Sequence, residues 1–598
     1  MILENRHKPF TLLGTANTVR LKPSVRQVNH VVEGWLKKCE DEHSHLCAHW
    51  TVISLPTRVI DVTDEPPRLY QSEGEGESYV CLSYCWGKDE NLTTTKDTLS
   101  DRLSGIEWDE MPKTFQQAIK ITRALNIQYL WIDALCIIQD DHDDWLRESS
   151  KMAEVYSGAY LTLCAQSSSG AQGGCMPSKV TQKCDPRSFG EVGSNYPQVH
   201  QIDVNVGPNQ IGTVHLRQKL SHSVILDEAT RSLPGPLLTR GWAYQERLLS
   251  NRLVHFTKNE LVWECRESML CECGGISGDI EIKLGRGIGT TRRSNFHWAS
   301  MTIAAMKFRK EKALLSQREE NDDDDDYYGL TGLYDEDNED VNDNEDVKDN
   351  EDIEDKWMSK ETISSLNTAW HEAITGYSSL KLKKHTDRLP AVAGLAQRFE
   401  DAGLGRYLWG IWEYELPYDI CWQYTGFRPW RQSFKPGMQS YEISSSPSWT
   451  WASVTGGVMW YGPGSRCNQL EADVQLQDSD KIVVCGNAIS GVEVSHDATL
   501  NKVILRKGSV QVKFIPDVTD WVYVGGQTSQ KHKKQVEVGE FVTCVRILTN
   551  ERRSVCMALI LRASTTIEGT KYLRVGLSNS DTPNVWFEKA DRRCFIIE

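Results

Sequence analysis

The feature that most constrains the fold is an alternation of short apolar runs with helical patterns. Between the runs, one helix is predicted to begin near Pro112, which suits a first helical turn, and another to cover residues 144–158. Strands that alternate with helices predict a parallel, doubly wound α/β sheet. Three runs suit its buried strands: YVCLSY at 79–84, QYLWID at 128–133 and YLTLCA at 160–165.

In such a sheet, ligands bind beyond the carboxyl ends of the strands. The sequence therefore predicts a crevice at that edge, with polar and aromatic side chains around it. Six residues are expected there because each lies at or just after the end of a strand: Ser83, Tyr84, Trp86, Gly87, Asp133 and Ser167.

Glu148 falls on the face of the second helix that should be buried. At about 100° per residue it lies among Met152, Val155 and Tyr156. A buried carboxylate is costly unless it is paired or hydrogen-bonded. Two interpretations remain open: a structural glutamate bonded to a backbone donor or an arginine, or a catalytic or ligand-binding carboxylate at the mouth of the crevice.

A second polar segment reads LLTRGWAYQERLLSNRLVHFTKNELVWEC at residues 237–265. A short helix is expected over 242–249, followed by a hairpin of 253–256 with 261–264. An arginine in such a setting suits a substrate carboxylate or phosphate. Alternatively, Arg240 or Arg247 pairs with an acid of the core, such as Glu148 or Asp133. The candidate substrate-binding residues here are Arg240, Trp242, Gln245 and Glu246.

Cysteine and histidine gather in the N-terminal stretch WLKKCEDEHSHLCAHW. No second CxxC pair appears nearby, so ordinary thiols at a helix end and loop are the favoured interpretation, and no metal site is predicted. The 17 cysteines of the chain show no small-domain disulfide pattern, which favours reduced thiols. The residues of this stretch that are zinc ligands by type are Cys39, His43, His45, Cys47 and His49.

Charge is concentrated in one insertion. Residues 319–355 contain 20 acidic residues and one lysine, whereas the whole chain has a net charge of −16. The insertion also repeats DNED at a period of six from residue 337 to 352. Like charges at this density repel and bury little surface, which predicts a disordered, solvated segment. The remaining charge is nearly balanced, and no basic concentration indicates a nucleic-acid partner.

The chain of 598 residues has room for two or three domains. No apolar run is long enough to span a bilayer, and no secretory signal is evident, so a soluble cytoplasmic protein is expected. The predicted division is an N-terminal segment (1–57), the sheet domain (58–265), a connecting region (266–318), the acidic insertion (319–355), a helical and aromatic-rich region (356–453) and a β-rich C-terminal region (454–598).

Three blocks of this chain resemble, in order, the three motifs of the fungal heterokaryon incompatibility (HET) domain. The first is YVCLSYCWG at 79–87, the second begins LWIDALCIIQDDHDDW at 130, and the third is TRGWAYQERLLSNRLVHF at 239–256. The resemblance covers roughly residues 58–264. It implies an effector of nonself recognition that triggers growth arrest or programmed cell death.

The HET family is also remotely similar to TIR domains, some of which cleave NAD. That likeness implies a flavodoxin/TIR-like sheet, NAD as a candidate substrate with no bound cofactor, and Glu148 as the catalytic carboxylate, with Asp133 as a positioning group. Ser83, Tyr84, Trp86 and Gly87 would then contact the substrate.

Two other interpretations stay open. In one, the domain is a non-enzymatic signalling module that self-associates or binds an unknown incompatibility partner. In the other, the chain is a degenerate accessory protein that no longer triggers death.

Overall fold

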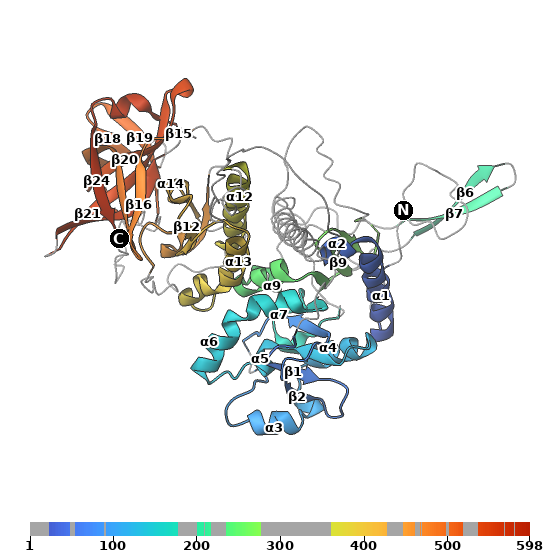
Figure 1. The fold of residues 1–598 in the computed structure, drawn as a ribbon. Coiled ribbons are helices and arrows are strands. Elements are labelled where there is room, and N and C mark those ends of the chain that lie inside the picture. Colours follow the sequence, from blue (N-terminus) through green and yellow to red (C-terminus); the bar gives the residue numbers. More distant parts are fainter. Residues whose placement is uncertain are drawn as a thin grey trace, which may run out of the picture.

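The computed structural model describes residues 19, 23–47, 54–88, 91–176, 200–207, 210–216, 235–274, 276, 360–426, 446–460, 467, 469–497, 502–517, 536–566, 569–578 and 581–598. The predicted acidic insertion lies outside these residues. An α/β part and a C-terminal β part lie at opposite sides of the helices α12 and α13 (Figure 1).

The central element of the α/β part is an eight-stranded sheet of order β10-β9-β8-β5-β3-β4-β1-β2. The middle strands β4, β3, β5 and β8 run parallel, whereas hairpins extend both edges antiparallel. The predicted parallel sheet is thus confirmed for the middle, and the whole sheet is mixed. The strands are β1 (Arg58–Asp61), β2 (Arg68–Gln71), β3 (Tyr79–Ser83), β4 (Tyr129–Trp131), β5 (Leu161–Cys164), β8 (Arg252–Phe256), β9 (Leu261–Cys265) and β10 (Met269–Cys271).

Helices pack on the sheet through its alternating side chains. On one face, the ring of Phe115 in α4 meets the ring of Tyr84 edge-on at 5.2 Å between centroids. On the other, the hydroxyl of Tyr79 donates to the carbonyl of Val155 in α7 at 2.7 Å. The helices of this part are α1 (Val25–Glu42), α2 (Ser44–Cys47), α3 (Leu99–Ser104), α4 (Lys113–Ala124), α5 (Asp133–Cys136), α6 (His142–Ser150), α7 (Met152–Gly158) and α9 (Gly241–Leu249).

The predicted helix over 144–158 is two helices in the structure. α6 ends and α7 begins at Lys151, which serves as the C-cap of the first and the N-cap of the second. The predicted short helix after Arg240 is confirmed as α9, and the predicted hairpin as β8 with β9. A separate two-stranded hairpin is formed by β6 (His200–Gly207) and β7 (Gln210–Leu216).

The middle of the chain is helical and rich in buried tryptophan. The expected helical stretch divides into α12 (Lys360–Tyr377) and α13 (Pro390–Asp401), and α13 packs against α6, α7 and α9. The short elements here are β11 (Tyr407–Leu408), β12 (Ile411–Trp412), α14 (Leu416–Asp419), β13 (Gln423–Gly426) and β14 (Gly457–Met459). The largest side chains of this core are Trp370, Trp412, Trp422, Trp449 and Trp451.

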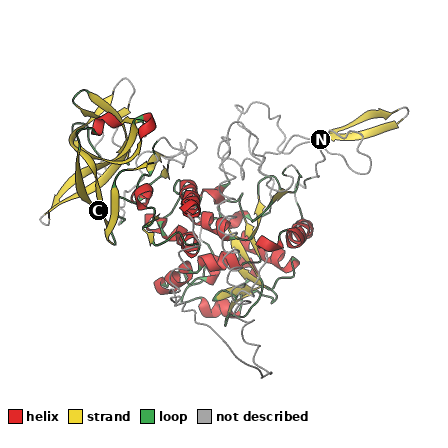
Figure 2. Cartoon of the chain, turned by 45° about the horizontal axis from the view of Figure 1, so that its top comes forward, coloured by secondary structure: helices red, strands yellow, loops and turns green. Residues whose placement is uncertain are grey.

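The C-terminal part confirms the predicted β-rich region and adds a closure that the sequence did not indicate. Six strands pair in a ring, because β20 pairs with both β17 and β21 (Figure 2). Closure leaves the ring without an open edge. Its strands are β17 (Lys481–Asp497), β18 (Lys502–Lys507), β19 (Val510–Pro516), β22 (Gly569–Ser578), β21 (Val555–Thr566) and β20 (Phe541–Asn550).

Four further strands lie on this ring: β15 (Gln469–Leu470), β16 (Asp473–Asp478), β23 (Thr582–Pro583) and β24 (Asp591–Ile597). A disulfide joins Cys485 of β17 to Cys594 of β24, so the expectation of reduced thiols does not hold for this pair. The other cysteines in the described parts of the chain are buried. Among the helices described, none combines the length and apolarity required to cross a bilayer.

Candidate functional site

The parallel strands bring several predicted residues together at their carboxyl ends. Ser83 is the last residue of β3, and Asp133 follows β4 by two residues. α9, which is packed against α7, adds Glu246 from a distant part of the chain. We call Ser83, Tyr84, Trp86, Asp133, Arg240 and Glu246 the carboxyl-end cluster.

Glu246 is a buried carboxylate of this cluster, with 7% of its surface exposed. The hydroxyl of Ser83 donates to its Oε2 atom. Burial raises the pKa of Glu246 to about 7, and the negative charge of Asp133 adds to this effect, whereas Arg240 and the hydrogen bonds from Ser83 and Tyr156 oppose it. The carboxyl group therefore titrates near neutral pH.

Asp133 is held by two donors. Trp86 Nε1 donates to Oδ2 at 2.7 Å, and the Ala134 N–H donates to Oδ1 at 2.7 Å. Burial raises the pKa of Asp133, although the bond from Trp86 and the charge of Arg240 oppose the rise. Arg240 in turn donates to the carbonyl of Tyr84. The cluster thus joins the loop after β3, the turn after β4 and the start of α9.

Gly87 has a structural reason to be glycine. Its φ of +88° lies in the left-handed region, and a Cβ there would come 2.9 Å from the Cα of Gly170. Gly170 belongs to the loop after β5, so the loops at the ends of the neighbouring strands β3 and β5 touch through their backbones. Ser167 lies in the same loop, and its N–H donates to the carbonyl of Phe256 at 3.3 Å.

Glu148 is buried as predicted, with 3% of its surface exposed, but the structure does not bring it to the carboxyl-end cluster. It lines a cavity of about 520 Å³ between α6–α7 and the segments around residues 54–57 and 72–74. None of the lining residues belongs to the cluster, and Tyr79 at the start of β3 and Gly158 before β5 are among them. The sequence predicted one crevice that holds both Glu148 and the residues at the carboxyl ends of the strands. That prediction is wrong, because Glu148 lines a separate cavity.

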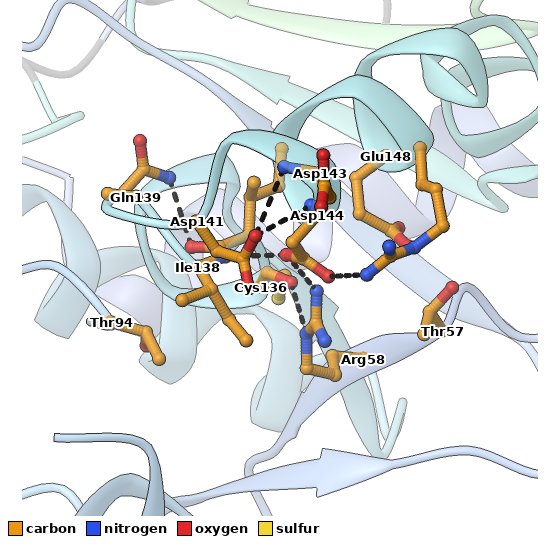
Figure 3. Close-up of polar contacts among 12 residues, drawn as sticks. Thr57, Arg58, Thr94, Cys136, Ile138, Gln139, Asp141, Asp143, Asp144 and Glu148 are labelled. Atoms are coloured by element: carbon orange, nitrogen blue, oxygen red, sulfur yellow. Dashed lines mark hydrogen bonds and ion pairs between the residues drawn. The ribbon is translucent and has the colours of Figure 1, made fainter. Parts of the chain in front are cut away.

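Lys151 supplies the cation beside Glu148. Its Nζ atom lies 3.8 Å from Glu148 Oε1 and donates to the hydroxyl of Thr57 at 3.1 Å. In Figure 3, Glu148 lies on the same helix as Asp144, on the side toward Thr57. Carboxylate and ammonium thus lie together at the wall of a cavity large enough for a small ligand.

Asp144 anchors the helix that carries Glu148, a role that sequence reasoning missed. Asp144 is 1% exposed, and its carboxylate accepts from Arg58 Nη2 at 2.5 Å and from the N–H of Ile138 at 2.9 Å (Figure 3). Arg147 Nη2 approaches the other oxygen at 3.1 Å. Arg58 also donates to the carbonyl of Cys136 at 2.7 Å, so α6 is fixed to both β1 and the turn after β4.

Two predicted binding residues of α9 face another part of the chain. Gln245 Oε1 accepts from the N–H of Gly394 at 2.9 Å, and Trp242 Nε1 donates to Asp387 at 3.2 Å. Both residues therefore hold α9 against the segment that contains α13. Arg247 pairs with an acid of the core, which was one of its two predicted roles. Its guanidinium donates to both oxygens of Glu264, at 2.8 and 3.2 Å.

Residues 79–246 match the family model described as heterokaryon incompatibility protein (HET). This segment is a HET domain. The match begins at the first residue of β3 and ends at Glu246, so it contains Glu148 and the entire carboxyl-end cluster. It associates the chain with heterokaryon incompatibility. No curated protein and no solved structure gave a significant match to the chain.

Proposed function

We propose that this chain is an effector of heterokaryon incompatibility whose HET domain triggers growth arrest or cell death after nonself recognition by cleaving NAD. The observation that carries the chemical part is the position of Glu148, a buried carboxylate that lines a cavity of about 520 Å³. Small-ligand sites have volumes of this order, about 300–1,000 Å³.

Cleavage breaks the bond between the ribose C1′ atom and the nicotinamide nitrogen, and the electron pair leaves with nicotinamide. Because the pyridinium becomes a neutral ring, no strong general acid is needed. The ribose develops oxocarbenium character, which a nearby carboxylate stabilises. Water then adds to C1′ and loses a proton, which gives ADP-ribose. Glu148 has the charge for the stabilising role, and Lys151 beside it can hold a phosphate or hydroxyl group of the substrate.

Access favours Glu148 over Glu246 as this carboxylate. Glu246 is surrounded by Ser83, Tyr156 and Arg240, so a substrate would have to displace internal hydrogen bonds to reach it. Glu148 already faces a cavity. In this proposal Asp133 and the rest of the carboxyl-end cluster position the strand ends and α9. The resemblance of the HET family to TIR domains, some of which cleave NAD, implies the same assignment.

The experiment measures nicotinamide release from NAD by the purified chain, together with growth and NAD content of a fungal host that expresses it. We expect Glu148→Gln to abolish release and growth arrest together. Asp143→Asn is the matched control, because it removes an exposed carboxylate from the same helix. If Glu148→Gln keeps the activity and Glu246→Gln loses it, the reaction belongs to the carboxyl-end cluster, and the assignment of Glu148 is wrong.

A second candidate function is a non-enzymatic module that self-associates or binds a partner. It is favoured by the internal pairing of the cluster, where Ser83, Trp86 and Arg240 all donate to acceptors of the same domain. In that case growth arrest would follow oligomerisation without loss of NAD, and Glu148→Gln would only lower thermal stability. Expression without any growth arrest would identify an accessory protein that no longer acts as an effector.

A further inference from the structure

Three buried cysteines from two distant segments meet beside the sheet. Cys39 lies near the end of α1, Cys47 ends α2, and Cys265 ends β9. Their sulfur atoms all lie within 4.8 Å of one another, and each side chain is at most 2% exposed. The sequence around residue 40 contains only two cysteines, Cys39 and Cys47, and no CxxC pair. The fold adds a third thiol from a strand more than 200 residues later in the chain.

A histidine lies at the same place. His43 is 3% exposed, and its Nδ1 atom lies 3.5 Å from the sulfur of Cys265. The backbone fixes it between the two helical cysteines, because its N–H donates to the carbonyl of Cys39 at 2.9 Å and its own carbonyl accepts from the N–H of Cys47 at 2.9 Å. Three thiols therefore meet in a buried space, and the imidazole of His43 lies beside Cys265. His43 lies outside the 4.8 Å limit that the three sulfur atoms meet, so its ring must move toward Cys39 or Cys47 to complete a set of four ligands.

We propose that Cys39, His43, Cys47 and Cys265 bind one structural zinc ion. Three thiolates and one imidazole are a common ligand set of structural zinc. With Zn–S of about 2.3 Å and Zn–N of about 2.0–2.1 Å, tetrahedral ligand atoms lie roughly 3.5–3.8 Å apart. The distance of 3.5 Å between His43 Nδ1 and the Cys265 sulfur matches this spacing. The three sulfur atoms lie within 4.8 Å of one another, so shifts of about 1 Å would bring them to coordination distance around one ion.

The surroundings of Cys265 fit a metal-bound thiolate. The N–H of Ser268 donates to its sulfur at 3.3 Å, and the hydroxyl of Ser268 lies 3.5 Å away. Such hydrogen bonds from outside the ligand set orient and stabilise a coordinating sulfur. Arg252, which is 3% exposed, pairs with Glu40 next to Cys39 at 3.8 Å and places a cation near the site.

The four ligands leave no open position, so the ion would act in folding rather than catalysis. It would tie α1 and α2, which precede the HET match, to β9, which follows it. A second group, Glu260, Cys271 and Cys273, also lies within metal-binding distance. It offers two thiols and one carboxylate, and both thiols come from one short segment, so it matches the ligand set of structural zinc less well than the first group. That group serves as the internal control.

The test begins with zinc content of the full chain, purified under reducing conditions with zinc in the growth medium. We expect about one zinc per chain. Replacement by cobalt should give the absorption of a tetrahedral thiolate site. Cys265→Ser should reduce the zinc content to background, and Cys271→Ser should leave it unchanged. His43→Gln should retain three thiolate contacts but bind zinc at least about tenfold more weakly.

Because Cys265→Ser could prevent folding, the unmodified chain provides a second measurement. A strong chelator should lower its melting temperature, and added zinc should restore it. A folded chain without zinc, or with a disulfide between two of the three thiols, would overturn the proposal. So would zinc that is lost in Cys271→Ser and kept in Cys265→Ser. Affinity unchanged in His43→Gln would remove His43 from the ligand set.

Discussion

Two glutamates of the α/β part show how partners decide the charge of a buried carboxylate. Burial raises the pKa of Glu246 to about 7, and Asp133 reinforces it. Burial also acts to raise the pKa of Glu264, but the Arg247 guanidinium and His255 hold it at about 2. At Glu264, the directly paired Arg247 lowers the pKa by more than burial raises it. At Glu246, the more distant Arg240 does not compensate for burial, and the pKa stays raised.

The raised pKa of Glu246 predicts a loss of stability toward alkaline pH. Between its ordinary value of 4.5 and about 7, the folded protein holds a proton that the unfolded chain has released. The free energy of unfolding should therefore fall by up to about 3 kcal/mol as pH rises through this range and then level off. Denaturant unfolding at pH 5 and pH 8 measures the fall. Glu246→Gln should lack it, and Asp143→Asn should show it as the parent does.

Removal of the partner of Glu264 should cost far more than removal of a surface partner. Arg247→Met leaves a buried carboxylate without its guanidinium, which should lower the free energy of unfolding by about 3–5 kcal/mol at pH 7. Arg406→Met is the control, since its pair with Glu413 is exposed and should contribute about 0–1 kcal/mol. Similar losses in both variants would show that Glu264 does not depend on Arg247. Below pH 4.5 the difference should shrink, because Glu264 then protonates in the unfolded chain.

At the scale of elements, the contact between the loops after β3 and β5 makes a defined prediction. Gly74 and Gly87 have similar φ values, +92° and +88°, but a Cβ on Gly74 meets nothing within 4 Å. Gly74→Ala should therefore cost only backbone strain, about 1–2 kcal/mol. Gly87→Ala should cost about 1–3 kcal/mol more, because the methyl group meets the Gly170 backbone. Melting temperatures of the two variants make the comparison, and equal losses would contradict it.

The elements that the sequence predicted well are those that local pattern determines. The apolar runs at 79–84, 128–133 and 160–165 became the parallel strands β3, β4 and β5, and the buried position of Glu148 followed from the helical period. The break at Lys151 was missed because one residue of altered backbone leaves the apolar period nearly intact.

Pairings between distant segments could not be predicted. Cys265 lies 222 residues from His43, and neither segment alone contains a complete ligand set. Likewise, alternation in the C-terminal region indicated strands, but their closure depends on β20 pairing on both sides. The candidate residues after β3 and β4 were placed correctly by topology, whereas the separate cavity of Glu148 arises from segments near residues 54 and 72 that carry no strong pattern.

At the scale of the whole molecule, one arginine joins the C-terminal ring to the tryptophan-rich region. Arg574 of β22 is fully buried, pairs with both oxygens of Asp517 at 3.1 Å, and donates to the carbonyls of Ile420 and Trp422. Its guanidinium also lies over the Trp422 ring, 3.5 Å from the centroid. The two regions therefore share a buried, charged anchor at their junction.

Arg574→Met should destabilise this junction by about 3–5 kcal/mol, because Asp517 would stay buried without its cation. We expect calorimetry to show the C-terminal ring melting separately and limited proteolysis to release it from the tryptophan-rich region. The double variant Arg574→Met with Asp517→Leu removes both charges and should recover part of the loss. A single unchanged transition in Arg574→Met would show that other contacts hold the two regions together.

The sheet order has a practical consequence for anyone who wishes to isolate the HET domain. The matched residues 79–246 supply only β3, β4 and β5 of the eight-stranded sheet, and β8, their parallel neighbour, begins at Arg252. A fragment trimmed to the family boundaries would expose two unpaired strand edges and lose Cys39 and Cys265. An expressible unit should instead start before α1 and extend past β10, with α13 supplied to cover α9.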